Sequence, residues 1–230
     1  MKTKDSFGKW TEEYQKEAKI NSELGWPSET LIRLFKGSYI PGLDKNYQGK
    51  KLLEVGFGNA NNMQFLATLG FKLAGTEVSE TICQIATKKL SAKGYSVDLK
   101  VGTNRSLPFP DHYFDFLVSW NVIHYESNEK HMREAIAEHA RVMKPGARFF
   151  LSTTGPKHKI LEGSQKIGDH LYQIGRSDDF RQGEVFFYFD APDYIRSYFG
   201  EYFKDILVGR THDFMMTETL DWWIATGVKK

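Results

Sequence analysis

An apolar run that leads into two closely spaced glycines constrains this chain more than any other feature. The run occupies residues 51–55 and contains Glu54, and Gly56 and Gly58 follow it directly. Glycine adopts backbone angles closed to other residues and lets a ligand approach the main chain, so the pattern is typical of a β-strand that enters a tight loop. Residues 60–69 have helical spacing, and the free N–H groups at the start of that helix would face the loop. The pattern predicts a binding loop for a nucleoside-like ligand, and the alternative is a strand-to-helix turn without a ligand.

Two residues in this stretch discriminate between ligands. A dinucleotide fingerprint has a third glycine three residues after the second, where this chain has Asn61. Glu54 would repel a diphosphate, but its carboxylate suits an ammonium or sulfonium group. The loop therefore favours a cationic nucleoside over a dinucleotide.

From residue 50 onward, short apolar runs alternate with helical patterns, which predicts βαβ units in one α/β domain. We expect a Rossmann-like, doubly wound and mostly parallel sheet with helices on both faces. The expected strands are 51–55, 72–77, 97–101, 114–120 and 147–153, and the expected helices are 60–69, 79–93 and 128–143. Farther on, a helix is expected at 191–200, followed by two strands, 203–214 and 221–228, that pair antiparallel.

Two segments depart from this alternation. Residues 1–48 form a predicted helical appendage, with one helix over 7–24 and another that starts near Ser28 and ends before Pro41, and the α/β domain spans 49–230. Residues 155–182 are rich in Gly, Lys, His and Asp and exceed common loop lengths, which predicts a lid or substrate loop. The alternative for this segment is a disordered insertion.

Composition narrows the function classes. A formal charge of +2 in 230 residues gives no global field for a polyanion, so we expect no nucleic-acid partner. The single cysteine, Cys83, cannot form an internal disulfide, and the first residues lack the apolar core of a signal peptide, so a cytoplasmic location is expected. No apolar run approaches the roughly 20 residues that span a bilayer. No group of His, Cys and acidic residues has metal-ligand spacing, so no metal is expected.

Glu77 supports nucleoside binding independently of the glycines. It ends the second expected strand, 23 positions after Glu54, where nucleotide-binding βαβ units place an acid on the ribose. Two carboxylate oxygens can accept hydrogen bonds from both hydroxyls of a diol.

Four motifs cover about residues 48–153: Glu54-Val-Gly56-Phe-Gly58-Asn-Ala60, Glu77, Leu107-Pro-Phe-Pro-Asp-His-Tyr-Phe-Asp115 and Arg141-Val-Met-Lys-Pro-Gly146. Together they resemble the motifs of class I S-adenosylmethionine-dependent methyltransferases, in the branch that acts on small molecules. The resemblance implies a seven-stranded sheet whose last strand is antiparallel. It also implies S-adenosylmethionine as cofactor, S-adenosylhomocysteine as product and a small-molecule acceptor.

The resemblance also assigns cofactor contacts. It implies that Glu54 lies near the methionine amino group, that Glu77 holds the ribose and that Val78 packs on the adenine. Where the family has an aspartate for the adenine amino group, this chain has Thr103 and Asn104, either of which can accept a hydrogen bond. The remaining residues expected at the cofactor are Gly56, Phe57, Gly58, Ala60, Trp120, Asn121, and, from the appendage, Tyr14 and Arg33, the latter as partner of the cofactor carboxylate.

Acceptor-side residues are harder to identify, because the sulfonium group already makes the methyl carbon electrophilic and few catalytic side chains are required. His124 follows the fourth expected strand and is the candidate general base. Candidate substrate contacts are Trp26, Tyr125, His170, Tyr172 and Arg181. Two other functions stay open: a module that binds the cofactor without catalysis, and a nicotinamide-dependent oxidoreductase. The sequence predicts neither the acceptor nor the oligomeric state.

Overall fold

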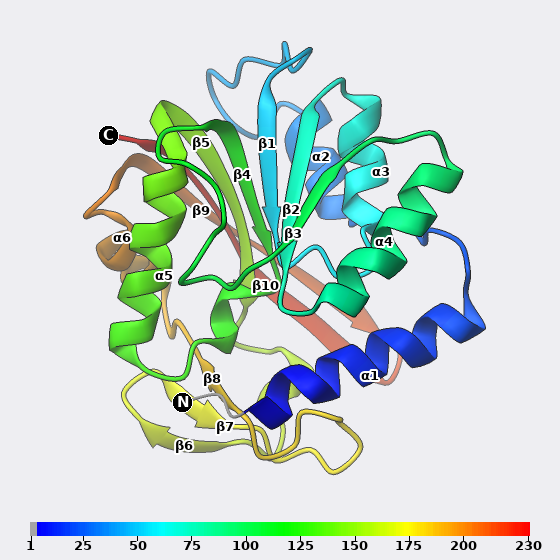
Figure 1. Ribbon diagram of the computed structural model, residues 1–230. Helices are drawn as coiled ribbons and strands as arrows, with labels where there is room; N and C mark the ends of the chain where they lie inside the picture. The colour runs from blue at the N-terminus through cyan, green and yellow to red at the C-terminus, as the bar shows by residue number, and fades with distance from the viewer. Residues whose placement is uncertain (1–3) are drawn as a thin grey trace.

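A mixed seven-stranded sheet forms the centre of the molecule in the computed structural model, which describes residues 4–230 (Figure 1). The strand order is β3-β2-β1-β4-β5-β10-β9. The strands are β1 (Lys51–Val55), β2 (Lys72–Glu77), β3 (Asp98–Val101), β4 (Phe114–Trp120), β5 (Met143–Thr154), β9 (Phe203–Met215) and β10 (Glu218–Lys229). β1 to β5 pair in parallel, whereas β10 is antiparallel to both β5 and β9. The predicted seven-stranded sheet with an antiparallel last strand is confirmed.

Helices cover both faces of the sheet, as predicted, because its central strands are apolar on both sides. One face carries α5 (Glu129–Val142) and α6 (Pro192–Phe199). The other face carries α2 (Glu29–Lys36), α3 (Asn61–Thr68) and α4 (Glu80–Ala92). Figure 1 shows these two layers on either side of the strands.

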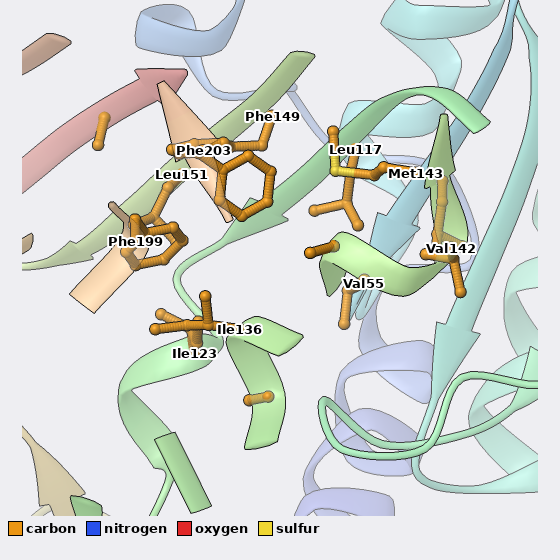
Figure 2. Close-up of a cluster of buried hydrophobic side chains, with 14 of the residues drawn as sticks. Val55, Leu117, Ile123, Ile136, Val142, Met143, Phe149, Leu151, Phe199 and Phe203 are labelled. Carbon is orange, nitrogen blue, oxygen red and sulfur yellow. The ribbon is translucent and has the colours of Figure 1, made fainter. Parts of the chain in front are cut away.

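Aromatic rings fill the core on both faces. On the α5–α6 face, Phe149 packs against Phe199 and Phe203, with ring centroids 5.0 Å and 4.7 Å apart (Figure 2). On the other face, Phe35 of α2 stacks on Phe150 of β5 at 4.4 Å. Phe35 is fully buried, so α2 is part of the same core although it lies in the predicted appendage.

Two elements lie across the carboxyl edge of the parallel strands. One is α1 (Lys4–Ile20), and the other is a small antiparallel sheet of β6 (Gln165–Gly168), β7 (Leu171–Gln173) and β8 (Val185–Phe187) (Figure 1). Short 3-10 turns, η1 (Ile123–Tyr125) and η2 (Lys159–Leu161), follow β4 and β5. The ends of the parallel strands are therefore enclosed by segments from opposite ends of the chain.

The structure differs from the sequence predictions at several element ends and in one long segment. The first helix ends at Ile20 rather than at residue 24, and β5 begins at Met143 rather than at 147, because Met143 already pairs with Phe114, ahead of a register shift in the β4–β5 ladder. Residues 155–182 hold short strands and a small apolar cluster that includes Ile160 and Ile174, so the alternative of a disordered insertion is wrong. Within residues 4–230, no helix combines the length and apolar character that crossing a bilayer requires.

Candidate active site

The loop after β1 takes the shape that its glycines predict. Gly56 and Gly58 have left-handed φ values of +67° and +54°, and Gly56 N donates to Thr76 O on β2 at 2.9 Å. A Cβ added at Gly56 would lie 2.5 Å from Val122 Cγ2. Ala60, which precedes α3, also has a left-handed φ of 61°, a conformation that costs alanine more than glycine. The turn therefore has no room for a side chain at Gly56, and its main chain can contact a ligand directly.

A cavity of about 770 Å³ opens at this loop, on the carboxyl edge of the sheet. Open α/β sheets bind ligands at this edge, and the volume suits a cofactor together with a small acceptor. The predicted site residues on its wall are Tyr14, Trp26, Glu54, Gly56, Phe57, Gly58, Glu77, Val78, Thr103, Asn104, Trp120, Asn121, Tyr125 and Arg181.

Glu77 holds the glycine loop in place. Its Oε1 accepts from Gly58 N at 3.0 Å, and its Oε2 accepts from Val78 N at 2.8 Å. The carboxylate is 8% exposed, so it lies at the cavity surface with its orientation fixed by backbone donors.

Glu54 is a buried acid with unused hydrogen-bonding capacity. Asn62 Nδ2 donates to its Oε1 at 2.9 Å, and its Oε2 is buried without a hydrogen-bond partner. Burial raises the pKa of Glu54 to about 8, and the nearby Glu77 adds to the shift. Asn62 Oδ1 accepts from Ser28 N at 2.9 Å, which fixes the amide orientation. A cationic ligand beside Glu54 would favour the ionised form of its carboxyl group.

Asn104 presents a second unpartnered acceptor at the other end of the cavity. Its Nδ2 donates to Glu126 Oε1 at 3.1 Å, and because a carboxylate only accepts, the amide orientation is fixed. Its Oδ1 is buried without a hydrogen-bond partner. Thr103, by contrast, forms a backbone bridge with Ser106.

Helix α1 and the segment before β8 meet over the cavity. Trp10 packs edge-on against Tyr125 at 5.2 Å and against Phe180 at 4.8 Å. The Arg181 guanidinium pairs with Asp179 and donates to the Tyr125 hydroxyl. These contacts close the cavity on the side of α1.

Five predicted site residues do not line the cavity. Ala60 is buried beneath the loop, and Arg33 is exposed and pairs with Glu29 at 2.7 Å, because the other face of α2 is the one that packs on the sheet. His170 and Tyr172 pack within the small sheet region, with ring centroids 5.3 Å from Phe187 and 5.8 Å from Phe186 respectively.

His124, the predicted general base, is the fifth. It is 1% exposed, and its Nδ1 lies 3.4 Å from Thr153 Oγ1. The 3-10 turn η1 places Tyr125 on the cavity wall and turns His124 inward beside Trp222, at 6.2 Å between ring centroids. The base prediction therefore lacks geometric support, since a base must reach the acceptor.

The histidine that does line the cavity, His131, was missed by sequence reasoning. Its Nδ1 lies 3.0 Å from Asn128 Nδ2, whose amide is oriented by its Oδ1 accepting from His131 N. An amide nitrogen only donates, so Nδ1 accepts and the ring proton belongs on Nε2. Burial and the nearby Arg105 lower the pKa of His131, which keeps the ring neutral at pH 7. Asn128, which caps α5, was the sequence feature that could have pointed to His131.

No group of three potential His, Cys, Asp or Glu metal ligands occurs among the residues that the structure describes.

Comparisons with known proteins agree on one family. A model described as a methyltransferase domain matches residues 53–151. A ubiquinone biosynthesis O-methyltransferase of Chelativorans sp. (strain BNC1) is 26% identical over 121 residues, which cover 53% of this chain and 47% of the relative. A fatty-acid O-methyltransferase of Mycolicibacterium smegmatis is 28% identical over 132 residues, covering 55% and 45%. The alignments thus span about half the length of these curated relatives.

Among solved structures, a protein of Methanosarcina mazei described as a SAM-dependent methyltransferase superposes with a TM-score of 0.68. The sequences are 17% identical, and the match covers 88% of this chain and 98% of the other. At this identity the match establishes the shared fold.

Proposed function

This chain belongs to the class I S-adenosylmethionine-dependent methyltransferases, and we propose that it transfers the cofactor's methyl group to an oxygen, nitrogen or carbon atom of a small molecule. The observation that carries the proposal is the buried Glu54 Oε2, which has no hydrogen-bond partner and lies beside the glycine loop. S-adenosylmethionine carries both an ammonium and a sulfonium group, so it matches this acid in charge.

The cavity wall supports a specific orientation of the cofactor. Glu54 would bind the ammonium group and Glu77 the ribose hydroxyls. At the other end, Asn104 Oδ1 would accept from the adenine amino group, in the role that an aspartate has in the family pattern. Val78 and Phe57 would cover the apolar parts of the nucleoside. The two buried oxygens without a hydrogen-bond partner, Glu54 Oε2 and Asn104 Oδ1, would thus each accept from a donor on the ligand.

The bound cofactor supplies an activated methyl group: the acceptor's lone pair forms the new bond to carbon while the sulfur–carbon bond breaks and its electron pair stays on sulfur. The protein has to orient the acceptor and exclude water. The contacts of Trp10 with Tyr125 and Phe180 support a role of α1 in excluding water. With His124 buried behind the wall, we propose that an acceptor proton leaves to solvent water.

A small acceptor is favoured by the enclosed cavity. The two curated relatives are named for ubiquinone biosynthesis and for fatty acids, both small-molecule chemistry. Of the cavity-lining side chains in residues 4–230, the arginines Arg105 and Arg181 already pair with acids, which leaves little to attract a nucleic-acid backbone.

Titration calorimetry tests the cofactor assignment. At pH 8, where Glu54 is partly ionised, we expect S-adenosylmethionine and S-adenosylhomocysteine to bind and NAD not to bind, since ionised Glu54 repels a diphosphate. Binding of NAD alone would contradict the proposal in favour of the oxidoreductase. Binding of both sulfur compounds, with no methyl transfer to any of a broad panel of small acceptors, would favour a binding module.

Removing the Asn104 side chain tests how the adenine is held. We expect Asn104→Ala to weaken S-adenosylhomocysteine binding by about 1–2 kcal/mol, the value of a hydrogen bond to a buried acceptor. Inosyl-homocysteine, which carries a carbonyl in place of the adenine amino group, should bind wild type and Asn104→Ala equally weakly. A loss in Asn104→Ala that is equally large for both ligands would place the adenine contact elsewhere.

A further inference from the structure

The end of the β9–β10 hairpin overhangs the carboxyl edge of the sheet. β10 pairs with β5 only between Trp222 and Val228, whereas its pairing with β9 continues to Glu218 and Met215. In the overhang, Thr211 faces Trp222 and Asp213 faces Leu220 across the two strands, and all four line the cavity. One face of the overhang is thus a wall of the cavity.

The amino-terminal end of α2 forms the opposite wall. Phe35 of α2 stacks on Phe150, and Leu31 shares the same core cluster with Ile224 of β10. The start of α2 and the overhang, with its Leu220 and Trp222, line one and the same cavity. Trp26 and the residues 28–30 line the cavity there.

The outer rim of this passage is strongly apolar and exposed. Trp26 is 93% exposed, and the tip of the hairpin carries Met215 on the cavity face of β9, Phe214 on its other face and Met216 in the turn, which are 63%, 67% and 90% exposed. Large apolar side chains gathered at one site mark an interaction surface, and methionine adapts its shape to varied ligands. Trp26 belongs to both the cavity wall and the exposed rim, so the apolar surface continues from the cavity.

The charges beside the passage are acidic. Asp213 forms no ion pair among residues 4–230, and Glu29 pairs only with the exposed Arg33. The arginines on the cavity wall are engaged: Arg105 with Glu126 and Glu134, Arg181 with Asp179. Among the side chains of residues 7–230 that line the cavity, an anionic group would therefore meet a carboxylate and no unpaired cation.

We propose that the acceptor is an amphiphile with a neutral or cationic polar head, which enters the cavity, and an apolar body, which leaves it between Trp26 and the hairpin tip. This inference rests on the proposed methyltransferase function and names the acceptor class. The overhang then selects substrates in two ways: Asp213 disfavours anionic heads, and the rim adds affinity for each covered methylene.

Non-reactive amphiphiles test this proposal. The probes are butyl-, octyl- and decyltrimethylammonium and, as the anionic counterpart, decyl sulfate, titrated below their micelle concentrations into protein saturated with S-adenosylhomocysteine. We expect affinity in the ammonium series to rise by up to about fourfold for each methylene that the rim covers. Decyl sulfate should bind at least roughly tenfold more weakly than decyltrimethylammonium.

Two variants assign the effect to the rim. We expect Phe214→Ser/Met215→Ser/Met216→Ser to flatten the chain-length dependence while S-adenosylhomocysteine affinity stays unchanged. The matched control is Leu207→Ser, which removes an apolar side chain of the same strand that is 45% exposed and outside the cavity. It should leave both measurements unchanged.

Several outcomes would overturn the inference. Equal affinity across chain lengths would contradict the proposed apolar body of the acceptor. Equal or tighter binding of decyl sulfate would contradict the proposed neutral or cationic head. A change of oligomeric state in the triple serine variant, seen by sedimentation, would reassign the rim to a protein contact. Failure of the protein to bind S-adenosylhomocysteine at all would instead refute the proposed function.

Discussion

Replacing Glu54 with glutamine should weaken S-adenosylmethionine binding at least about 100-fold, because a buried ammonium group would lose its charge partner, which costs roughly 3–5 kcal/mol. The substitution keeps the shape of the side chain and its contact with Asn62 Nδ2, which an amide oxygen can accept. Titration calorimetry at pH 8 measures the loss. A less than tenfold change would mean that Glu54 does not contact the ammonium group.

The same substitution should stabilise the ligand-free protein. Burial raises the pKa of Glu54 to about 8 in the fold, whereas an unfolded glutamate titrates near about 4.3. Between these values the unfolded chain has lost the proton that the folded chain retains, so stability falls as pH rises. Glutamine does not titrate, and the variant should gain up to about 5 kcal/mol over wild type at pH 8. Thermal unfolding at pH 5 and pH 8 tests this, and an equal difference in stability at both pH values would contradict it.

Cofactor affinity should change with pH in the direction opposite to the stability of the ligand-free protein. Binding an ammonium group requires ionised Glu54, so wild-type affinity should rise by up to about tenfold per pH unit toward pH 8. Above about pH 8 the ligand's own amino group loses its proton, so affinity should pass through a maximum and then fall. The glutamine variant should lack the rise below pH 8. Glu54 therefore makes the free protein less stable at the pH at which the cofactor binds best.

The parallel part of the fold could be predicted because its signals are local. Apolar runs bounded by turns gave 51–55, 72–77 and 114–120 with the bounds that the structure has. The strand ends then identify the cavity, because parallel strands present their carboxyl ends at one edge. This is why Glu54 and Glu77 could be placed from the sequence.

The orientation of residues beyond the strand ends could not be predicted, because it depends on geometry that the local sequence does not encode. His124 and Tyr125 are neighbours, and only the 3-10 turn decides which one faces the cavity. Arg33 was expected to reach the cofactor, but the burial of Leu31 and Phe35 turns it toward solvent. The strands β6 to β8 have three or four residues each, which is too few for an alternation of apolar and polar residues to be recognised in the sequence.

Replacing Gly56 with alanine should reduce cofactor affinity at least tenfold and destabilise the fold by about 2–5 kcal/mol. Two costs add: a left-handed φ of +67°, about 1–2 kcal/mol for a residue with a Cβ, and the overlap with Val122, typically about 1–3 kcal/mol. Calorimetry and chemical denaturation measure the two effects separately.

Two controls separate these costs. Gly146 has a φ of +80° with nothing within 4 Å of an added Cβ, so Gly146→Ala should show the backbone cost alone and bind cofactor normally. Gly56→Ala/Val122→Ala removes the methyl groups nearest to the new Cβ and should recover part of the stability. If Gly56→Ala costs no more than Gly146→Ala, the overlap is relieved by movement of Val122. Because Gly56 lies between β1 and the cavity, relief by movement of the loop instead would appear as lost affinity without lost stability.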